Sequence, residues 1–130
     1  MDDVQRADFL RSQHRAVLAT RRSDGRPQLS PIVFATDESG RLMVSTRSAT
    51  AKARNIRRDP RVSFCVITGE FFGDWAQVDG RASLVEMPEA LAVLRSVYRA
   101  VAGEHPDWEE FDRDMVAQDR VVIVVEPDKP

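Results

Sequence analysis

Short apolar stretches separated by turn residues predict six β-strands in this chain. They cover residues 15–21, 27–34, 41–46, 61–67, 75–85 and 120–126. The first two are joined by Ser23-Asp24-Gly25-Arg26, and Asp-Gly between two such stretches is typical of a β-hairpin turn. Asp37-Glu38-Ser39-Gly40 joins the second stretch to the third in the same way. We therefore expect the first three strands to form an antiparallel meander.

Apolar residues at helical spacing predict four helices, over residues 3–13, 50–58, 88–102 and 106–117. The clearest is 88–102, where Pro88 suits the first turn and Gly103 ends the helix. Six strands with one inserted helix, and a helical pair before the last strand, favour a closed or nearly closed small β-barrel with peripheral helices. We predict an α+β, mainly β fold in which residues 1–130 form a single domain.

The second strand contains Pro31, which cannot donate a hydrogen bond to a neighbouring strand. Alternation along the strand places Gln28 and Ser30 on one face, and Leu29 and Pro31 on the other. We expect Pro31 at an edge or a bulge, where the backbone faces something other than a strand.

Charge is distributed unevenly along a chain whose net charge is −2. Residues 41–61 contain seven basic residues and one acid, whereas residues 103–119 contain seven acids and one base. The two stretches either meet, within one chain or across a dimer, or are both solvated surfaces.

Hydroxyl groups precede the basic helix predicted over residues 50–58. A helix N-terminus offers free N–H groups and the positive end of the helix dipole. Ser48, Thr50 and Lys52 stand at this position, so the sequence predicts a site for phosphate or carboxylate. The alternative is a solvated helix face, which is the interpretation we prefer for Arg57 and Arg58.

The chain lacks the usual catalytic and metal-binding patterns. Its two histidines, His14 and His105, fit no metal-ligand spacing, and Cys65 lies in a strand as a small packed residue. No Gly-rich nucleotide loop occurs. We therefore predict no catalytic side chain and no metal site, and expect a bound cofactor to carry the chemistry.

Several other classes of function are disfavoured. The cations of the basic helix are not interleaved with aromatic residues, which argues against nucleic acid as a partner. The uncharged stretches of the chain, such as residues 62–69, are too short to span a membrane. The N-terminus does not resemble a signal peptide, and the single cysteine fits a reducing compartment. These observations predict a cytoplasmic protein.

Four segments carry a family resemblance: LATRRSDGRPQLSPIVF, LMVSTRSATAKARNIRRDPRVSF, WAQVDGRASL and YRAVAGEHPDWEEFDRDMVAQDRVVIVV. The first three resemble the split β-barrel flavin and deazaflavin reductases related to pyridoxamine 5′-phosphate oxidase. The last resembles the actinobacterial branch that uses the deazaflavin coenzyme F420. The resemblance covers residues 9–126 and implies a six-stranded antiparallel split β-barrel.

The resemblance also implies a homodimer with the cofactor in a groove between subunits. The planar ring would lie against the second and third strands, and the phosphate would rest on the basic helix. The partner subunit would add the start of the fifth strand. The implied cofactor-binding residues are Gln28, Leu29, Ser30, Pro31, Val44, Ser45, Thr46, Thr50, Lys52, Arg54, Asn55, Trp75 and Gln77.

The function implied by the resemblance is that of an oxidoreductase. It would use reduced F420 to transfer hydride to a small conjugated acceptor of the enone, quinone or tetrapyrrole type. The alternatives are an oxidase or reductase that binds flavin mononucleotide (FMN), and a non-catalytic protein that binds F420 or flavin. Thr50 departs from the family pattern, because some relatives have an arginine at this position. Trp75 has an alternative role as a core or interface residue.

Overall fold

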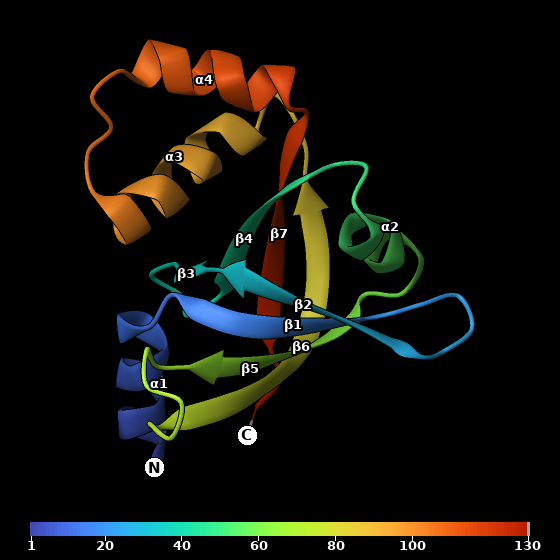
Figure 1. The fold of residues 1–130 in the computed structure, drawn as a ribbon, viewed down its shortest axis with the longest axis vertical. Helices are drawn as coiled ribbons and strands as arrows, with labels where there is room; N and C mark the ends of the chain where they lie inside the picture. The colour runs from blue at the N-terminus through green and yellow to red at the C-terminus, as the bar shows by residue number, and fades with distance from the viewer. Residues whose placement is uncertain (130) are drawn as a thin grey trace.

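The computed structural model describes residues 1–129 as a strongly curved antiparallel sheet with four helices around it (Figure 1). The strands are β1 (Arg15–Arg21), β2 (Pro27–Val33), β3 (Ala35–Thr36), β4 (Leu42–Arg47), β5 (Arg61–Ile67), β6 (Trp75–Val85) and β7 (Arg120–Pro127). The helices are α1 (Asp3–Ser12), α2 (Ala51–Arg58), α3 (Ala90–Ala102) and α4 (Trp108–Ala117). The mainly β, split-barrel α+β fold is therefore confirmed.

The prediction of six strands was wrong, because the sheet has seven strands in the order β2-β1-β5-β6-β7-β4-β3. The predicted strand over 27–34 ends at Val33, and the chain bends at Phe34. The Phe34 side chain is fully buried in the barrel, and its N–H donates to the His14 carbonyl at 2.9 Å. Ala35 and Thr36 then pair with Met43 and Leu42 of β4.

This bend closes the barrel through the covalent chain. The two outer strands of the sheet, β2 and β3, are separated only by Phe34. The continuous stretch from β2 to β3 therefore pairs with β1 through β2 and with β4 through β3. The barrel is split between β2 and β4. Pro31 lies in β2, an edge strand of the sheet, as its missing N–H predicts.

Alternate residues of the strands fill the barrel. In β6 the burial alternates from Trp75 to Ala82, and β1 shows the same period of two. Phe34 and Phe64 pack inside with their ring centroids 6.3 Å apart, beside Leu18 and Ile123. The apolar and polar alternation of the sequence thus specifies which side of each strand faces the core.

A second apolar layer lies outside the barrel, where α3 and α4 cover β4 and β7 (Figure 1). Leu94, Val97 and Phe111 pack there against Met43 and Val122. Strand β7 is consequently buried on both faces, which explains its continuous run of apolar residues. Among residues 1–129, no helix is both long and apolar enough to cross a membrane.

Two acids of the acidic stretch, residues 103–119, form ion pairs with α3. Arg95 pairs with Asp112, with N–O distances of 2.9 and 2.5 Å, and Arg99 pairs with Glu104 at 2.8 Å. Within the described part of this chain, no ion pair joins the acidic stretch to residues 41–61. Within one chain the two stretches therefore meet through a backbone hydrogen bond, from the Ser48 N–H to the Asp119 carbonyl at 2.9 Å, and not through ion pairs.

Gly80 marks the corner at which β6 leaves β5 and begins to pair with β7. It is opposite Val62 on one side and Pro127 on the other. A Cβ atom on Gly80 would lie 2.4 Å from the Glu126 carbonyl oxygen, too close for any side chain. Glycine is thus required here for a close backbone approach.

Replacing Gly80 by alanine is expected to lower the free energy of unfolding by about 1–3 kcal/mol, because the new methyl group displaces β7. Urea denaturation measures this change. Gly69→Ala is the matched control, since its Cβ would make only an ordinary 3.5 Å contact with Arg15. Equal stability of the two variants would contradict the assignment of Gly80 as a packing constraint.

Candidate functional site

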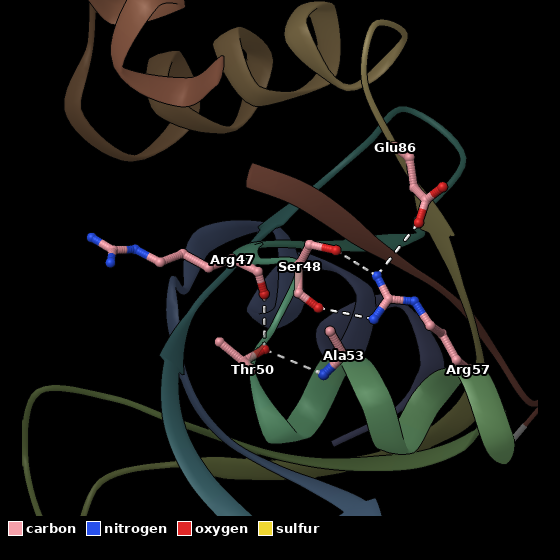
Figure 2. A network of polar contacts seen from close by, with 6 residues as sticks. All are labelled: Arg47, Ser48, Thr50, Ala53, Arg57 and Glu86. Carbon is pink, nitrogen blue, oxygen red and sulfur yellow. Dashed lines mark hydrogen bonds and ion pairs between the residues drawn. The ribbon is translucent and has the colours of Figure 1, made fainter. Parts of the chain in front are cut away.

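The candidate site begins where the chain turns from β4 into α2. Thr50 is the N-cap of α2, and its hydroxyl accepts a hydrogen bond from the Ala53 N–H at 3.3 Å (Figure 2). The same hydroxyl donates to the Arg47 carbonyl at 3.0 Å. Threonine at this position starts the helix by satisfying a free N–H group. The helix ends at Arg58, and Asp59 has extended backbone because the following Pro60 disfavours the helical conformation.

Arg57 holds this turn from the far end of the helix. Its guanidinium donates to the Ser48 carbonyl at 2.9 Å and to the Ser48 hydroxyl at 2.7 Å, and it reaches Glu86 at 3.4 Å (Figure 2). Arg57 is exposed, as the interpretation of a solvated helix face predicts, but its guanidinium also binds the turn. Ser48 lies at the predicted turn, but its oxygens are engaged by Arg57.

A cleft of about 590 Å3 lies between the split in the barrel and the α3–α4 pair. This volume falls within the range of small-molecule sites. The barrel contributes residues of β2 and β4, and the helices contribute an apolar wall. The lining residues are Pro31, Ile32, Val33, Ser45, Thr46, Arg47, Thr50, Lys52, Leu94, Val97, Tyr98, Val101, Ala102, Phe111, Met115 and Arg120.

Three cations line this cleft: Arg47, Lys52 and Arg120. Arg47 and Arg120 are directly opposite each other on β4 and β7. Burial, and after it the charge of Arg120, lowers the pKa of Lys52 below its ordinary 10.5. Burial, followed by the charge of Arg47, likewise lowers the pKa of Arg120. The three cations therefore repel one another across a partly desolvated cleft.

The described residues that line the cleft include no carboxylate to offset these charges. Figure 2 shows the Arg47 side chain extending away from the Thr50–Arg57 network. Lys52 and the Arg47 guanidinium form no hydrogen bond or ion pair within residues 1–129, and Arg120 donates to the amide oxygen of Gln118 at 2.8 Å. An anion bound here would relieve the repulsion and satisfy these donors.

A smaller hollow of about 370 Å3 lies on another side of α2, toward the β1–β2 turn. Arg54, Asn55 and Gln28 line this hollow, whereas Thr50 and Lys52 line the cleft. The residues predicted to hold the phosphate are thus divided between two surfaces. Arg54 is tied to the Ala49 carbonyl at 3.1 Å.

Asn55 has a clear structural role. Its amide donates to the Thr20 hydroxyl and to the Gln28 side-chain oxygen, both at 3.0 Å. Its own oxygen accepts from Arg58 at 2.9 Å. Asn55 is buried, so these bonds fasten α2 to the β1–β2 hairpin.

The other predicted ring-binding residues occupy three environments. Pro31, Ser45 and Thr46 line the cleft. Val44 is 1% exposed and packs inside the barrel, so its side chain does not reach the cleft. Leu29 is 64% exposed on the outer face of the sheet, and Ser30 is half-buried on the opposite face of β2.

Trp75 and Gln77 lie on the outer face of the sheet and do not line the cleft of their own chain. Trp75 is 62% exposed, which excludes a core role within this chain. Gln77 donates to Asp79 at 3.1 Å. Their contribution to a partner's site stays a prediction.

Sequence reasoning missed Arg47, Arg120 and Tyr98. Arg47 stands at the end of an apolar strand and Arg120 at the start of another. Many surface cations have such positions, so the sequence does not single these two out. Only the register of β4 against β7 shows that they lie together. Tyr98 was assigned to the apolar stripe of α3, and its place in the cleft depends on how α3 lies on the barrel.

Several solved structures share this fold. The chain is 32% identical to a conserved hypothetical protein from Mycobacterium tuberculosis, with a TM-score of 0.79 over 99% of this chain and 82% of that chain. It is 28% identical to a protein named F420 reductase, with a TM-score of 0.73 over 94% of this chain and 92% of that one. A haem storage protein from Vibrio cholerae, 22% identical, shares the fold with a TM-score of 0.67 over 98% and 91%.

The family model described as pyridoxamine 5′-phosphate oxidase matches residues 3–129. The match includes every strand of the barrel, the start of α2 and both helices that wall the cleft. The chain therefore belongs to the pyridoxamine 5′-phosphate oxidase family of split β-barrel proteins, which bind flavin or the deazaflavin F420.

Proposed function

We propose that this protein is an oxidoreductase that binds coenzyme F420 and uses its reduced form to reduce a small conjugated acceptor of the enone, quinone or tetrapyrrole type. The observation that carries the proposal is the pair of cations Arg47 and Lys52, unpaired within residues 1–129, in an apolar cleft whose described lining has no carboxylate. F420 combines a planar ring with a tail that bears several negative charges. Such a molecule matches both the apolar walls and the excess of positive charge.

The cleft combines cationic and apolar residues, which suit the charged tail and the planar ring of this cofactor. Lys52 and Arg47 would make charge-assisted hydrogen bonds to the phosphate of the tail. The start of α2 adds its dipole, because Thr50 satisfies one N–H and leaves others available. Pro31, Ser45 and Thr46 form the barrel side of the cleft, against which the ring would lie.

The chemistry belongs to the cofactor. When bound, a reduced deazaflavin supplies a hydride to an electron-poor double bond, and solvent supplies the accompanying proton. The protein contributes orientation and water exclusion, which lower the barrier without an acid or a base. Among the described lining residues, neither histidine nor cysteine occurs, which agrees with this division of roles.

FMN is the second candidate, favoured by the family model, which is described as pyridoxamine 5′-phosphate oxidase. Lys52 and Thr50 suit a single phosphate equally well. The charges of Arg47 and Lys52, unpaired within the described chain, favour the more highly charged F420, as does the 28% identical relative named F420 reductase. A protein that binds either cofactor without turnover is the third hypothesis.

We further propose that the protein is a homodimer joined through the outer face of β2, β1, β5 and β6. Register places Val33, Arg15, Ile67 and Trp75 in one row across these strands. Val33, Ile67 and Trp75 are all exposed apolar residues, and Leu29 continues the surface. A self-complementary contact would bury this surface and bring Trp75 toward the partner.

The cofactor assignment predicts a preference between two ligands. Titration with oxidised F420 is expected to change its fluorescence and to give a lower Kd than titration with FMN under the same conditions. Added salt should weaken F420 binding more than FMN binding, because more charges are neutralised. Tight FMN binding without any F420 response would contradict the proposal.

Lys52→Met is expected to weaken F420 binding by about 1–3 kcal/mol, the range for a hydrogen bond to a charged group. The substitution should not lower the free energy of unfolding. The folded state lowers the pKa of Lys52, so the charged amine opposes folding at pH 7, and this cost disappears as pH rises toward 10.5. The free energy of unfolding of Lys52→Met at pH 7 should therefore equal or exceed that of the wild type. Unchanged F420 affinity would remove Lys52 from the site.

Sedimentation velocity tests the dimer. The wild type should sediment as a dimer at micromolar concentration, and Ile67→Glu should sediment as a monomer, because a charge would be buried in the contact. Val116→Glu changes a residue of α4 that is 56% exposed, and it should stay dimeric. A monomeric wild type would contradict the shared groove.

A further inference from the structure

The helical wall of the cleft is apolar although its helices are highly charged. Leu94, Val97 and Val101 of α3, with Phe111 and Met115 of α4, face the cleft. The charges of these helices lie elsewhere, for example in the Arg95–Asp112 pair. Within the described lining, Tyr98 is the residue of α3 and α4 that carries a polar side-chain group. A tail of phosphate and carboxylates gains little from such a wall, whereas an apolar molecule does.

Aromatic packing holds this wall in place. The Tyr98 ring lies 5.0 Å from His105, 5.8 Å from Trp108 and 5.4 Å from Phe111, measured between centroids. The Trp108 ring is covered by the Arg99 guanidinium at 4.6 Å, and its N–H donates to Glu104 at 3.1 Å. The tyrosine hydroxyl has no hydrogen-bond partner within residues 1–129, so it is free to bond a ligand.

Arg120 is the cation that adjoins this wall. It begins β7, directly after the turn that follows α4, and lines the cleft together with Phe111 and Met115. Its Nε donates to Gln118, which leaves the other guanidinium N–H groups available. No carboxylate in the described chain pairs with it. An arginine with this freedom is suited to bind a carboxylate through two parallel hydrogen bonds.

We propose that the helical wall and Arg120 select an apolar acceptor that carries a carboxylate. The acid group would bind Arg120, and the apolar body would lie along α3 and α4. The conjugated bond would then face the barrel side of the cleft, where the cofactor ring is proposed. The role of this ligand as acceptor rests on the proposed function, but its binding does not.

Isothermal titration calorimetry with 2-naphthoate and its methyl ester tests the inference on the cofactor-free protein. Naphthoate is expected to bind more tightly than the ester. Arg120→Gln should weaken naphthoate at least about tenfold, the effect of losing a charged hydrogen bond, and change the ester less than twofold. Because Arg120 is repelled by Arg47, this variant should fold normally.

Two further variants locate the site. Val101 is 39% exposed in the wall, so Val101→Glu should fold and should weaken both ligands. Arg113→Gln removes an exposed arginine of α4 outside the cleft and should weaken neither. No binding of naphthoate, or equal binding by wild type and Arg120→Gln, would overturn the inference.

A competition experiment separates this inference from the cofactor assignment. Naphthoate should bind with unchanged affinity to protein saturated with F420, because the two ligands occupy different parts of the cleft. Mutual displacement would show that the cofactor itself covers the helical wall, and would overturn the acceptor role. If neither F420 nor FMN binds, the proposed function fails, while the Arg120-dependent binding of naphthoate still supports the acid site.

Discussion

Electrostatic repulsion among three cations is the constraint on which the site depends. The pairing of β4 with β7 sets Arg47 opposite Arg120, and the first turn of α2 brings Lys52 to the same cleft. The described lining offers no carboxylate, and burial lowers the pKa of Lys52 and of Arg120. A fold that keeps such an arrangement is less stable than one with a paired acid. Binding of an anion would restore the stability lost to this repulsion. The cluster therefore indicates a ligand site and not a structural ion pair.

The rest of the structure supports this cluster. The Thr50 cap and the Arg57 clamp define where α2 starts, and the buried Asn55 fastens the helix to the β1–β2 hairpin. The bend at Phe34 joins the two edges of the sheet and creates the split beside β2. The helices inserted between β6 and β7 supply the opposite wall. The cleft forms where these elements meet, and no single element contains it.

Local patterns were sufficient for most of the fold. The predicted strand over 61–67 is β5, and that over 75–85 is β6, because alternation and turn residues act within a few positions. The missed strand, β3, depends on Phe34 leaving one edge of the sheet for another, which no local pattern encodes. Helix-start chemistry singled out Lys52 and Thr50, and both line the cleft. Val44 was implied by the family resemblance, but alternate residues of a strand face opposite sides, and the Val44 side chain is buried in the barrel.

A crystal structure of the protein with F420 bound tests the central claim most directly. The account predicts density for the phosphate of the tail within hydrogen-bonding distance of the Lys52 Nζ and the Arg47 guanidinium, at the first turn of α2. A phosphate bound in the hollow beside Arg54 and Arg58, with no contact to Lys52, would contradict it.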